Sequence, residues 1–248
     1  MPACLYCGES DRPFTSEEHV IPESLGNKGH GGQPPVVLPA GVVCDGCNHG
    51  RLSWLDETLI KHAPIALMRT LRGVTSKSGK LPEAKFGNAT LRMVEGGRVR
   101  HVLFDTPSRK AFADDGQGRV DLQLIDSRPM SPQYCRTLTR ALYKMTLGFI
   151  YIDMPEVAVS ELFDPVRRMI LGLEEFHGHL VTRNRWQPSL MTGNLASLRY
   201  AITETPEGQK NVFSVFEYVG FEMSAGLLVR EMKHPEHFPL DVYTIDTF

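Results

Sequence analysis

Residues 44–60, CDGCNHGRLSWLDETLI, join a Cys-x-x-Cys pair directly to a helical pattern. The two cysteines of such a pair point their sulfurs toward one position, and Gly46 suits the tight turn between them. Beyond the turn, Leu52, Leu55 and Leu59 recur with the spacing of one helix face. The stretch therefore predicts a cysteine turn that opens an amphipathic helix.

A second pair, Cys4 and Cys7, lies near the start of the chain and completes a set of four with Cys44 and Cys47. Four sulfurs at one point make a complete tetrahedral shell for Zn²⁺. The alternatives are two disulfides, which the absence of a secretory signal disfavours, and a redox dithiol, which would need a βαβ context. The pattern therefore predicts a structural zinc site that pins both ends of the insert at residues 8–43.

The insert begins with a polar Glu-His pair that leads into a short apolar run, EHVIP at residues 18–22. Pro22 breaks the run, so we expect a strand or extended segment that ends in a loop. Residues 36–43 hold two more short apolar runs, which predict a strand pair or one bent strand. The expected order is strand, loop, strand and helix, with zinc at both ends.

This N-terminal part resembles the HNH endonucleases, or ββα-metal nucleases, in their zinc-knuckle form. The resemblance rests on Cys4-x-x-Cys7, on the segment EHVIPESLG at residues 18–26, and on Cys44-x-x-Cys47-Asn48 at the start of a helix. It covers about the first 60 residues, and the order and adjacency of the three motifs make it specific.

The resemblance implies hydrolysis of phosphodiester bonds, most often in DNA. His19 would be the general base that activates water. Glu18 and Asn48 would hold one catalytic divalent ion, Mg²⁺ or Mn²⁺, because hard oxygen ligands suit those ions and thiolates suit zinc. The alternatives are that His19 is an ordinary histidine, that Glu18 is a solvated acid, and that Asn48 is a helix N-cap. Such proteins often belong to phage, mobile-element or host-defence settings.

Three further side chains are candidates for contact with the substrate. His49 and Arg51 stand in the first turn of the predicted helix, where phosphates bind readily. His30 lies in a glycine-rich stretch of the insert. For each of them the alternative is a solvated side chain.

Two positions depart from the family pattern. The middle Asn of the family, nine residues before Asn48, is replaced here by Pro39, and Glu18 stands where Asp is commoner. The middle Asn is thought to brace the loop that holds the base. We therefore expect Asn27 or a backbone amide to supply that bracing.

The rest of the chain predicts a larger α+β domain of unrecognised fold, at residues 75–248, after an HNH module at residues 1–74. Ser131-Pro132 predicts the start of a helix, because Ser is a good N-cap and Pro suits the first helical position. Residues 157–172 predict a further helix, and apolar runs such as 212–221 predict strands.

On the helix after Ser131, three basic residues recur at intervals of four: Arg136, Arg140 and Lys144. The spacing places them near one helix face, which predicts either phosphate contacts or a solvated face. The domain as a whole is a candidate for targeting, for regulation, or for contact with a second copy or a protein partner.

Composition limits the partners. The 248 residues carry 27 Lys and Arg against 29 Asp and Glu, a formal charge of −2, with 42% hydrophobic residues. This excludes a disordered chain and a generic basic coat for nucleic acid, so any DNA contact must be local. Without an apolar run long enough for a bilayer, or a signal peptide, we expect a soluble, cytoplasmic protein with no membrane partner.

The leading hypothesis is therefore a metal-dependent endonuclease with a structural zinc and a catalytic Mg²⁺ or Mn²⁺. The first alternative is a catalytically weak, zinc-dependent nucleic-acid-binding module in which Pro39 accompanies a loss of catalysis. The second is a redox or zinc-sensing protein that uses the four cysteines alone.

Overall fold

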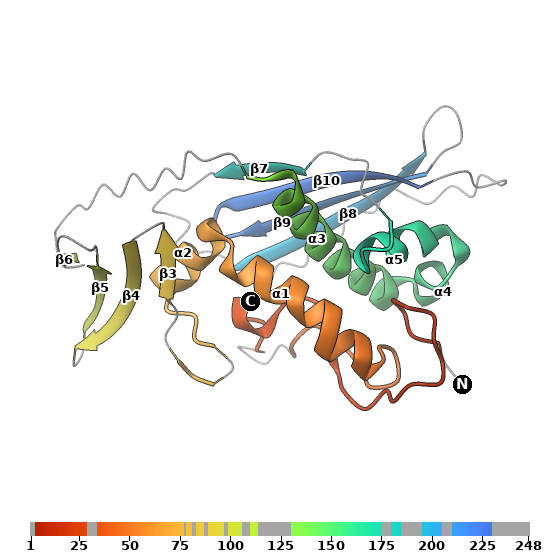
Figure 1. Ribbon diagram of the computed structural model, residues 1–248, viewed down its shortest axis with the longest axis horizontal. Helices are drawn as coiled ribbons and strands as arrows, with labels where there is room; N and C mark the ends of the chain where they lie inside the picture. Colours follow the sequence, from red (N-terminus) through yellow and green to blue (C-terminus); the bar gives the residue numbers. More distant parts are fainter. Residues whose placement is uncertain are drawn as a thin grey trace.

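The computed structural model describes the chain over a set of ranges. These are 3–28, 34–76, 78–80, 83–86, 89–96, 99–105, 110–113, 130–174, 180–184, 195–204 and 210–229. Within them, helices and antiparallel sheets form an α+β protein, which confirms the predicted class. Figure 1 shows one long helix against a four-stranded sheet, the N-terminal segment beside that helix, and a second sheet at one end.

The N-terminal segment follows the predicted order of strand, loop, strand and helix. Its elements are β1 (Glu18–His19), the 3₁₀ turn η1 (Glu23–Leu25), β2 (Val37–Leu38), the π-helical turn η2 (Cys47–Leu52) and α1 (Ser53–Lys61). The two strands pair antiparallel, with Glu18 opposite Leu38 and His19 opposite Val37. The π-helical turn passes directly into α1, so the second cysteine pair and the helix are one continuous element.

The helical run changes direction at His62, whose ψ of 124° ends α1 and starts α2 (Ala63–Arg72). Pro64 lies in the first turn of α2, where its missing N–H costs no helical hydrogen bond. Gly73, with a φ of 63°, ends the helix in a left-handed conformation that favours glycine.

The longest helix, α3 (Pro132–Asp153), lies at the centre of the described structure. Its start is confirmed: the Ser131 Oγ accepts a hydrogen bond from the Tyr134 backbone N–H at 3.2 Å. Residues 141–150 are all buried, so this stretch has no solvated side. One side of α3 packs against α1, and another packs against the four-stranded sheet (Figure 1).

The large sheet has the strand order β7-β10-β9-β8, with antiparallel neighbours throughout. The strands are β7 (Leu180–Asn184), β8 (Ala196–Glu204), β9 (Lys210–Tyr218) and β10 (Phe221–Val229). The chain reverses between β9 and β10 at Val219 and Gly220, which both have a positive φ, as a two-residue hairpin requires. The strand predicted at residues 212–221 is therefore wrong at its end.

The single helix predicted at residues 157–172 is also wrong. The chain forms three short pieces instead: α4 (Pro155–Ala158), the 3₁₀ turn η3 (Glu161–Phe163) and α5 (Asp164–Ile170). Ser160 breaks the helix because its ψ of 159° is extended.

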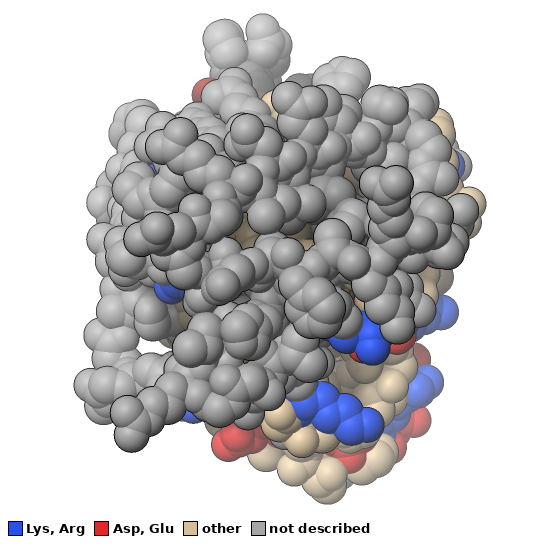
Figure 2. All heavy atoms as spheres, turned by 90° about the vertical axis from the view of Figure 1, so that its left-hand side faces the viewer, with Lys and Arg blue, Asp and Glu red and all other residues tan. Residues whose placement is uncertain are grey.

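The second sheet is a four-stranded meander. Its strands are β3 (Glu83–Phe86), β4 (Ala89–Gly96), β5 (Val99–Asp105) and β6 (Lys110–Ala113). Ala84 and Leu91 pack with Ala66 of α2 in a small cluster of their own. Figure 2 looks at this end of the molecule and shows basic and acidic side chains side by side on the described surface.

One hydrophobic core runs through the rest of the described structure. It includes Leu5 beside the first cysteine pair, Leu55 of α1, Leu142 of α3 and Phe216 of β9. The core therefore crosses the predicted boundary between residues 74 and 75, and the division into two domains stays a prediction. None of the helices that the structure describes is long and apolar enough to cross a membrane.

Candidate functional site

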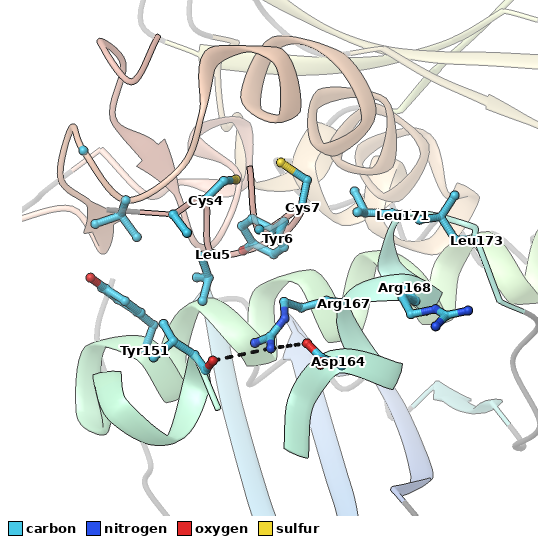
Figure 3. Close-up of a pocket in the computed structure, with 15 residues that line it drawn as sticks. Cys4, Leu5, Tyr6, Cys7, Tyr151, Asp164, Arg167, Arg168, Leu171 and Leu173 are labelled. Atoms are coloured by element: carbon cyan, nitrogen blue, oxygen red, sulfur yellow. Dashed lines mark hydrogen bonds and ion pairs between the residues drawn. The ribbon is translucent and has the colours of Figure 1, made fainter. Parts of the chain in front are cut away.

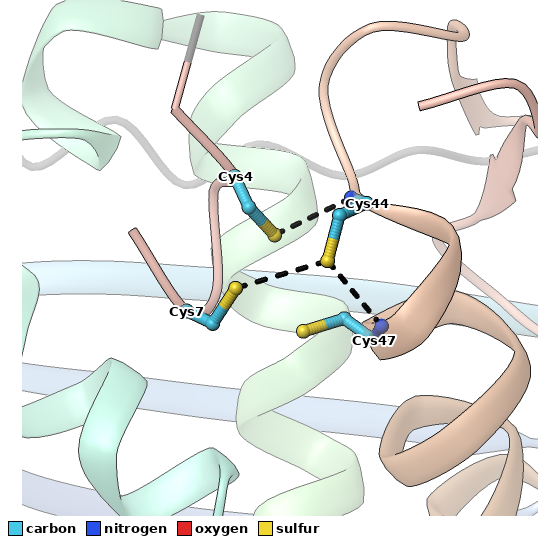
Figure 4. Close-up of side chains that lie close together, drawn as sticks. All are labelled: Cys4, Cys7, Cys44 and Cys47. Carbon is cyan, nitrogen blue, oxygen red and sulfur yellow. Dashed lines mark hydrogen bonds between the residues drawn. The ribbon is translucent and has the colours of Figure 1, made fainter. Parts of the chain in front are cut away.

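The four paired cysteines come together in space, and Figure 4 shows their sulfurs turned toward one another. The ligand atoms all lie within 4.8 Å of one another, and the Sγ atoms of Cys7 and Cys44 are 3.7 Å apart. A tetrahedron with Zn–S bonds of about 2.3 Å has sulfur–sulfur edges of about 3.8 Å. The cluster is therefore compatible with a structural zinc site.

The four thiols differ in their electrostatic environment. All four thiols are free of disulfides, and backbone N–H groups of Cys44 and Cys47 donate to the sulfurs of Cys4 and Cys44, each at 3.4 Å. The hydrogen bond with Cys47 is the largest cause that lowers the pKa of Cys4 to about 4, against burial, which raises it. Burial raises the pKa of Cys7 to about 11, and the hydrogen bond with Cys4 is the largest cause that raises the pKa of Cys47. A thiolate is the form that binds zinc.

Asp45, inside the second cysteine turn, connects the cluster to the residues that precede β1. Its carboxylate accepts hydrogen bonds from the hydroxyl and backbone N–H groups of Ser16 and Thr15, at 2.7 to 3.1 Å. The bond from the Ser16 hydroxyl, followed by that from Thr15, lowers the pKa of Asp45 to about 2. The second cysteine turn thereby holds the start of the strand that carries Glu18 and His19.

A cavity of about 510 Å³ lies between β1, η1, η2 and α1. It is lined by the three residues predicted to be catalytic, Glu18, His19 and Asn48, together with His49. Two motifs separated in the sequence, the Glu-His pair and the start of the helix after Cys47, therefore meet at one surface of the protein.

His19 lines this cavity beside a carboxylate. Its side chain is 30% exposed, and its Nε2 lies 3.9 Å from Oε2 of Glu23, which also lines the cavity. A carboxylate beside an imidazole stabilises the imidazolium that forms when the ring accepts a proton.

Asn48 lies in the π-helical turn, a geometry that recurs at functional sites. Its side-chain amide donates to the Ser16 hydroxyl at 3.0 Å and to the Glu17 carbonyl at 2.8 Å. These bonds use both amide hydrogens and tie the helix start to the residues before β1. The amide oxygen is the atom that this arrangement leaves for a ligand.

Glu18 is buried, and its nearest charged partner comes from a distant part of the chain. Its carboxylate forms an ion pair with the Lys144 ammonium of α3, which also contacts Oδ1 and Oδ2 of Asp56 at 2.9 and 3.0 Å. Burial, with the charge of Glu18 as a smaller contribution, raises the pKa of Asp56 to about 6, although Lys144 opposes the shift. Two carboxylates of the site thus share one buried ammonium.

The oxygen donors at this cavity do not form a closed metal cage among the described residues. In the described residues, the four cysteines are the only group of three or more His, Cys, Asp or Glu side chains close enough to hold a metal. Mg²⁺ ordinarily keeps several waters and takes one or two carboxylates plus substrate phosphate. Glu18 and Asn48 could supply such a partial set.

The other predicted substrate contacts fall in different places. His49 is exposed and lines the cavity. Arg51 donates from Nη1 to the Leu171 carbonyl at 2.7 Å, just beyond the end of α5, and its role as a DNA contact stays a prediction. His30 lies outside the described residues.

Asn27 braces the loop between β1 and β2, as expected from the replacement at Pro39. Its buried amide donates to the carbonyls of Ile21 and Val36 at 2.7 and 3.0 Å, and its oxygen accepts from the Val36 N–H at 2.8 Å. One side chain therefore joins the end of the β1 segment to the start of β2.

Sequence reasoning missed three charged residues of the site: Glu23, Asp56 and Lys144. Glu23 lies four residues after His19, a spacing that pairs side chains only on a helix, and here a strand and Pro22 separate the two. The sequence around Asp56 predicts that this residue lies on the polar face of a helix. For Lys144, both predicted readings are wrong: it neither contacts solvent nor lies on an open basic face, because its side chain is fully buried.

A second cavity, of about 450 Å³, lies between the first cysteine pair and α5 (Figure 3). Its Arg167 donates to the carbonyls of Ala158 and Ser160 at 2.7 and 2.8 Å and pairs with Asp164 at 2.5 Å. These contacts tie α4 to α5, so Arg167 acts there as a structural residue.

Comparison of the chain with models of protein families, with curated proteins and with solved structures finds no match. The arrangement of side chains around the first cavity, beside the cysteine cluster, is therefore the basis for a functional assignment.

Proposed function

We propose that this protein is a metal-dependent endonuclease that hydrolyses phosphodiester bonds in DNA, built on a zinc-braced HNH module. The observation that carries the proposal is that Glu18, His19 and Asn48 line one cavity. Glu18 and His19 lie on β1, and Asn48 lies in the π-helical turn before α1. Asn48 directly follows Cys47 of the cysteine cluster.

In this proposal His19 is the general base. Its imidazole accepts a proton from a water molecule, whose oxygen then bonds to phosphorus while the bond to the leaving sugar oxygen breaks. The leaving oxygen takes its proton from solvent. Glu23 stabilises the imidazolium through its carboxylate, 3.9 Å from Nε2.

The divalent ion would be held by the Glu18 carboxylate and the Asn48 amide oxygen. Bound there, it would neutralise charge on the scissile phosphate and the leaving oxygen. Asn48 can serve this role because its hydrogen bonds to Ser16 and Glu17 use the amide hydrogens and fix the direction of the oxygen.

The test is a plasmid-nicking assay of the purified protein in EDTA, Mg²⁺ and Mn²⁺, with zinc measured on the same samples. We expect cleavage only with a divalent ion, and a loss of about 10²- to 10⁴-fold in His19→Ala, because general-base catalysis is worth about that much. Asn48→Ala should lose cleavage as well. Both variants should keep about one zinc per chain, the number that a single four-cysteine site binds.

His49→Ala is the matched histidine control. Because His49 is exposed at the rim, it should raise KM and leave kcat nearly unchanged. Full cleavage by a folded His19→Ala protein would show that His19 is not the base.

The ion pair between Glu18 and Lys144 favours a second candidate, a zinc-dependent nucleic-acid-binding module with weak or no catalysis. In that case the ammonium, rather than a divalent ion, is the permanent partner of Glu18. DNA binding that persists in EDTA, with no nicking in Mg²⁺ or Mn²⁺, would support this candidate against the nuclease.

A further inference from the structure

Lys144 is the feature of the site that the proposed mechanism leaves without a role. Its side chain is 0% exposed, although it lies on α3, far along the chain from the cysteine cluster. Burial of an ammonium is costly unless every N–H finds a partner, so a buried lysine calls for a specific explanation.

Among the residues that the structure describes, all of the partners of this ammonium belong to the candidate site. It donates to the His19 backbone carbonyl at 2.8 Å, contacts both carboxylate oxygens of Asp56, and forms the ion pair with Glu18. A backbone carbonyl and two carboxylates are the acceptors that a buried ammonium requires.

The backbone around Lys144 is held as firmly as its side chain. The Tyr6 hydroxyl, from the first cysteine turn, donates to the Lys144 carbonyl at 3.0 Å. Four residues further along α3, Gly148 lies so close to Val20 that a Cβ there would be 3.1 Å from two of its methyl groups. This part of α3 therefore contacts the first cysteine turn, the segment at residues 18–20 and helix α1.

We infer that Lys144 is a positioning residue of the proposed nuclease site. Its ammonium holds the Glu18 carboxylate and the His19 backbone in their working positions, and it occupies the space between Glu18 and Asp56. A divalent ion held by Glu18 and Asn48 would then have to bind outside the space that the ammonium occupies. This inference rests on the proposed function and adds α3 to the site.

The charges of the three side chains set the expected effects. With Glu18 and Asp56 ionised and Lys144 protonated, the group carries a net charge of −1. Loss of Lys144 makes it −2, and loss of the Asp56 charge makes it 0. A nearby divalent ion should respond to each change, because charges a few ångströms apart inside a protein interact strongly.

The experiment measures Mn²⁺ binding by electron paramagnetic resonance at pH 8 and nicking kinetics in parallel. For Lys144→Met, we expect Mn²⁺ to bind roughly tenfold more tightly because a positive charge is removed. We also expect kcat to fall by about 100-fold with KM unchanged, because the transition-state geometry is lost. Tighter metal binding together with slower cleavage is the signature of a positioning residue.

Asp56→Asn and the double variant complete the series. Asp56→Asn should bind Mn²⁺ roughly tenfold more weakly, and Lys144→Met/Asp56→Asn should return to the affinity of the wild type while kcat stays low. If Lys144→Met alone does not fold, the double variant is compared with Asp56→Asn, and the same change in affinity and rate is expected.

Thr146→Val is the matched control on α3. Thr146 is buried two residues further along and bonds to Ser214 of the sheet rather than to the site. It should lower stability and leave Mn²⁺ affinity and kcat unchanged. If Lys144→Met behaves like Thr146→Val, Lys144 is only a structural bridge and the inference is overturned.

The two readouts separate this inference from the proposed function. A wild-type protein that binds Mn²⁺ but does not nick DNA would overturn the nuclease, and the Mn²⁺ series would still decide whether the charge of Lys144 affects the ion. A wild-type protein that does neither would overturn both.

Discussion

At the scale of single residues, the site depends on buried polar side chains that each hold several backbone groups. Asn27 is the clearest case, because one amide satisfies two carbonyls and one N–H in the loop after β1. An unpaired buried group costs about 1–3 kcal/mol, so such a side chain is worth more than a single hydrogen bond. The loop next to His19 therefore has a defined shape.

His62 makes a prediction about pH. It is 6% exposed where α1 meets α2, its Nδ1 lies 3.2 Å from the Tyr134 hydroxyl, and its ring contacts Phe221. Burial lowers the pKa of His62 from 6.5 to about 4, so the unfolded chain binds a proton more readily than the folded one. The contribution of His62 to the free energy of unfolding is therefore fully present above about pH 6.5 and is lost as the pH falls from about 6.5 toward 4.

The measurement is urea unfolding at pH 7.5 and pH 5. Between these values the wild type should lose about 2 kcal/mol more than His62→Phe, as the shift in the pKa of His62 requires. His49→Gln, an exposed histidine, should show the same pH dependence as the wild type. An equal loss in wild type and His62→Phe would contradict a buried, neutral His62.

At the scale of elements, α3 is the helix against which the N-terminal segment is assembled. It offers Lys144 and Gly148 on one side to β1 and α1, while Tyr143 on another side donates to carbonyls of β9 and β10 at 2.8 and 3.1 Å. The lack of a side chain at Gly148 permits the close approach of Val20, the residue that follows His19.

We expect Gly148→Ala to destabilise the protein by about 1 kcal/mol. Helix propensity would favour Ala by about 1 kcal/mol, but overpacking against the two Val20 methyl groups costs about 1–3 kcal/mol. In a Val20→Ala background the clash is absent, so the same change should be stabilising. Urea unfolding of the wild type, the two single variants and the double variant gives the sign of each change in the free energy of unfolding. Stabilisation by Gly148→Ala alone would show that Val20 moves aside.

At the scale of the whole molecule, the core that joins the cysteine cluster to the large sheet predicts one cooperative unit. Leu5, Leu55 and Phe216 belong to the same buried cluster, so α1 and β9 should open together. Native-state hydrogen exchange should give amides of α1 and β9 opening free energies within about 1 kcal/mol of each other.

Zinc removal extends this prediction. Cys44→Ser should lower both values together, because a zinc ion bound by the cluster would stabilise the unit as a whole. The small β3–β6 sheet, which has its own cluster with α2, is the internal control and should exchange at lower free energy. Opening of α1 several kcal/mol below β9 would instead support the predicted domain boundary at residue 74.

Local spacing was enough to predict several parts of this protein. The cysteine cluster follows from two short turns, the strand–loop–strand–helix order from apolar runs between them, and the start of α3 from Ser131 and Pro132. Each of these depends on residues within a few positions of one another, where backbone geometry leaves few choices. The hairpin at Val219 shows the limit, because the turn has Val where Asn or Asp is usual, and the pattern therefore reads as continuous strand.

The charge arrangement of the site depends on packing between distant segments. Lys144 lies 125 residues from His19 and 88 from Asp56 along the chain, and no periodicity reports such a contact. The basic spacing on α3 predicted an open face because a helix usually has one. Residues 141–150 of α3 are instead buried between α1 and the sheet, and there an ammonium is stable only among carboxylates and carbonyls that other segments supply.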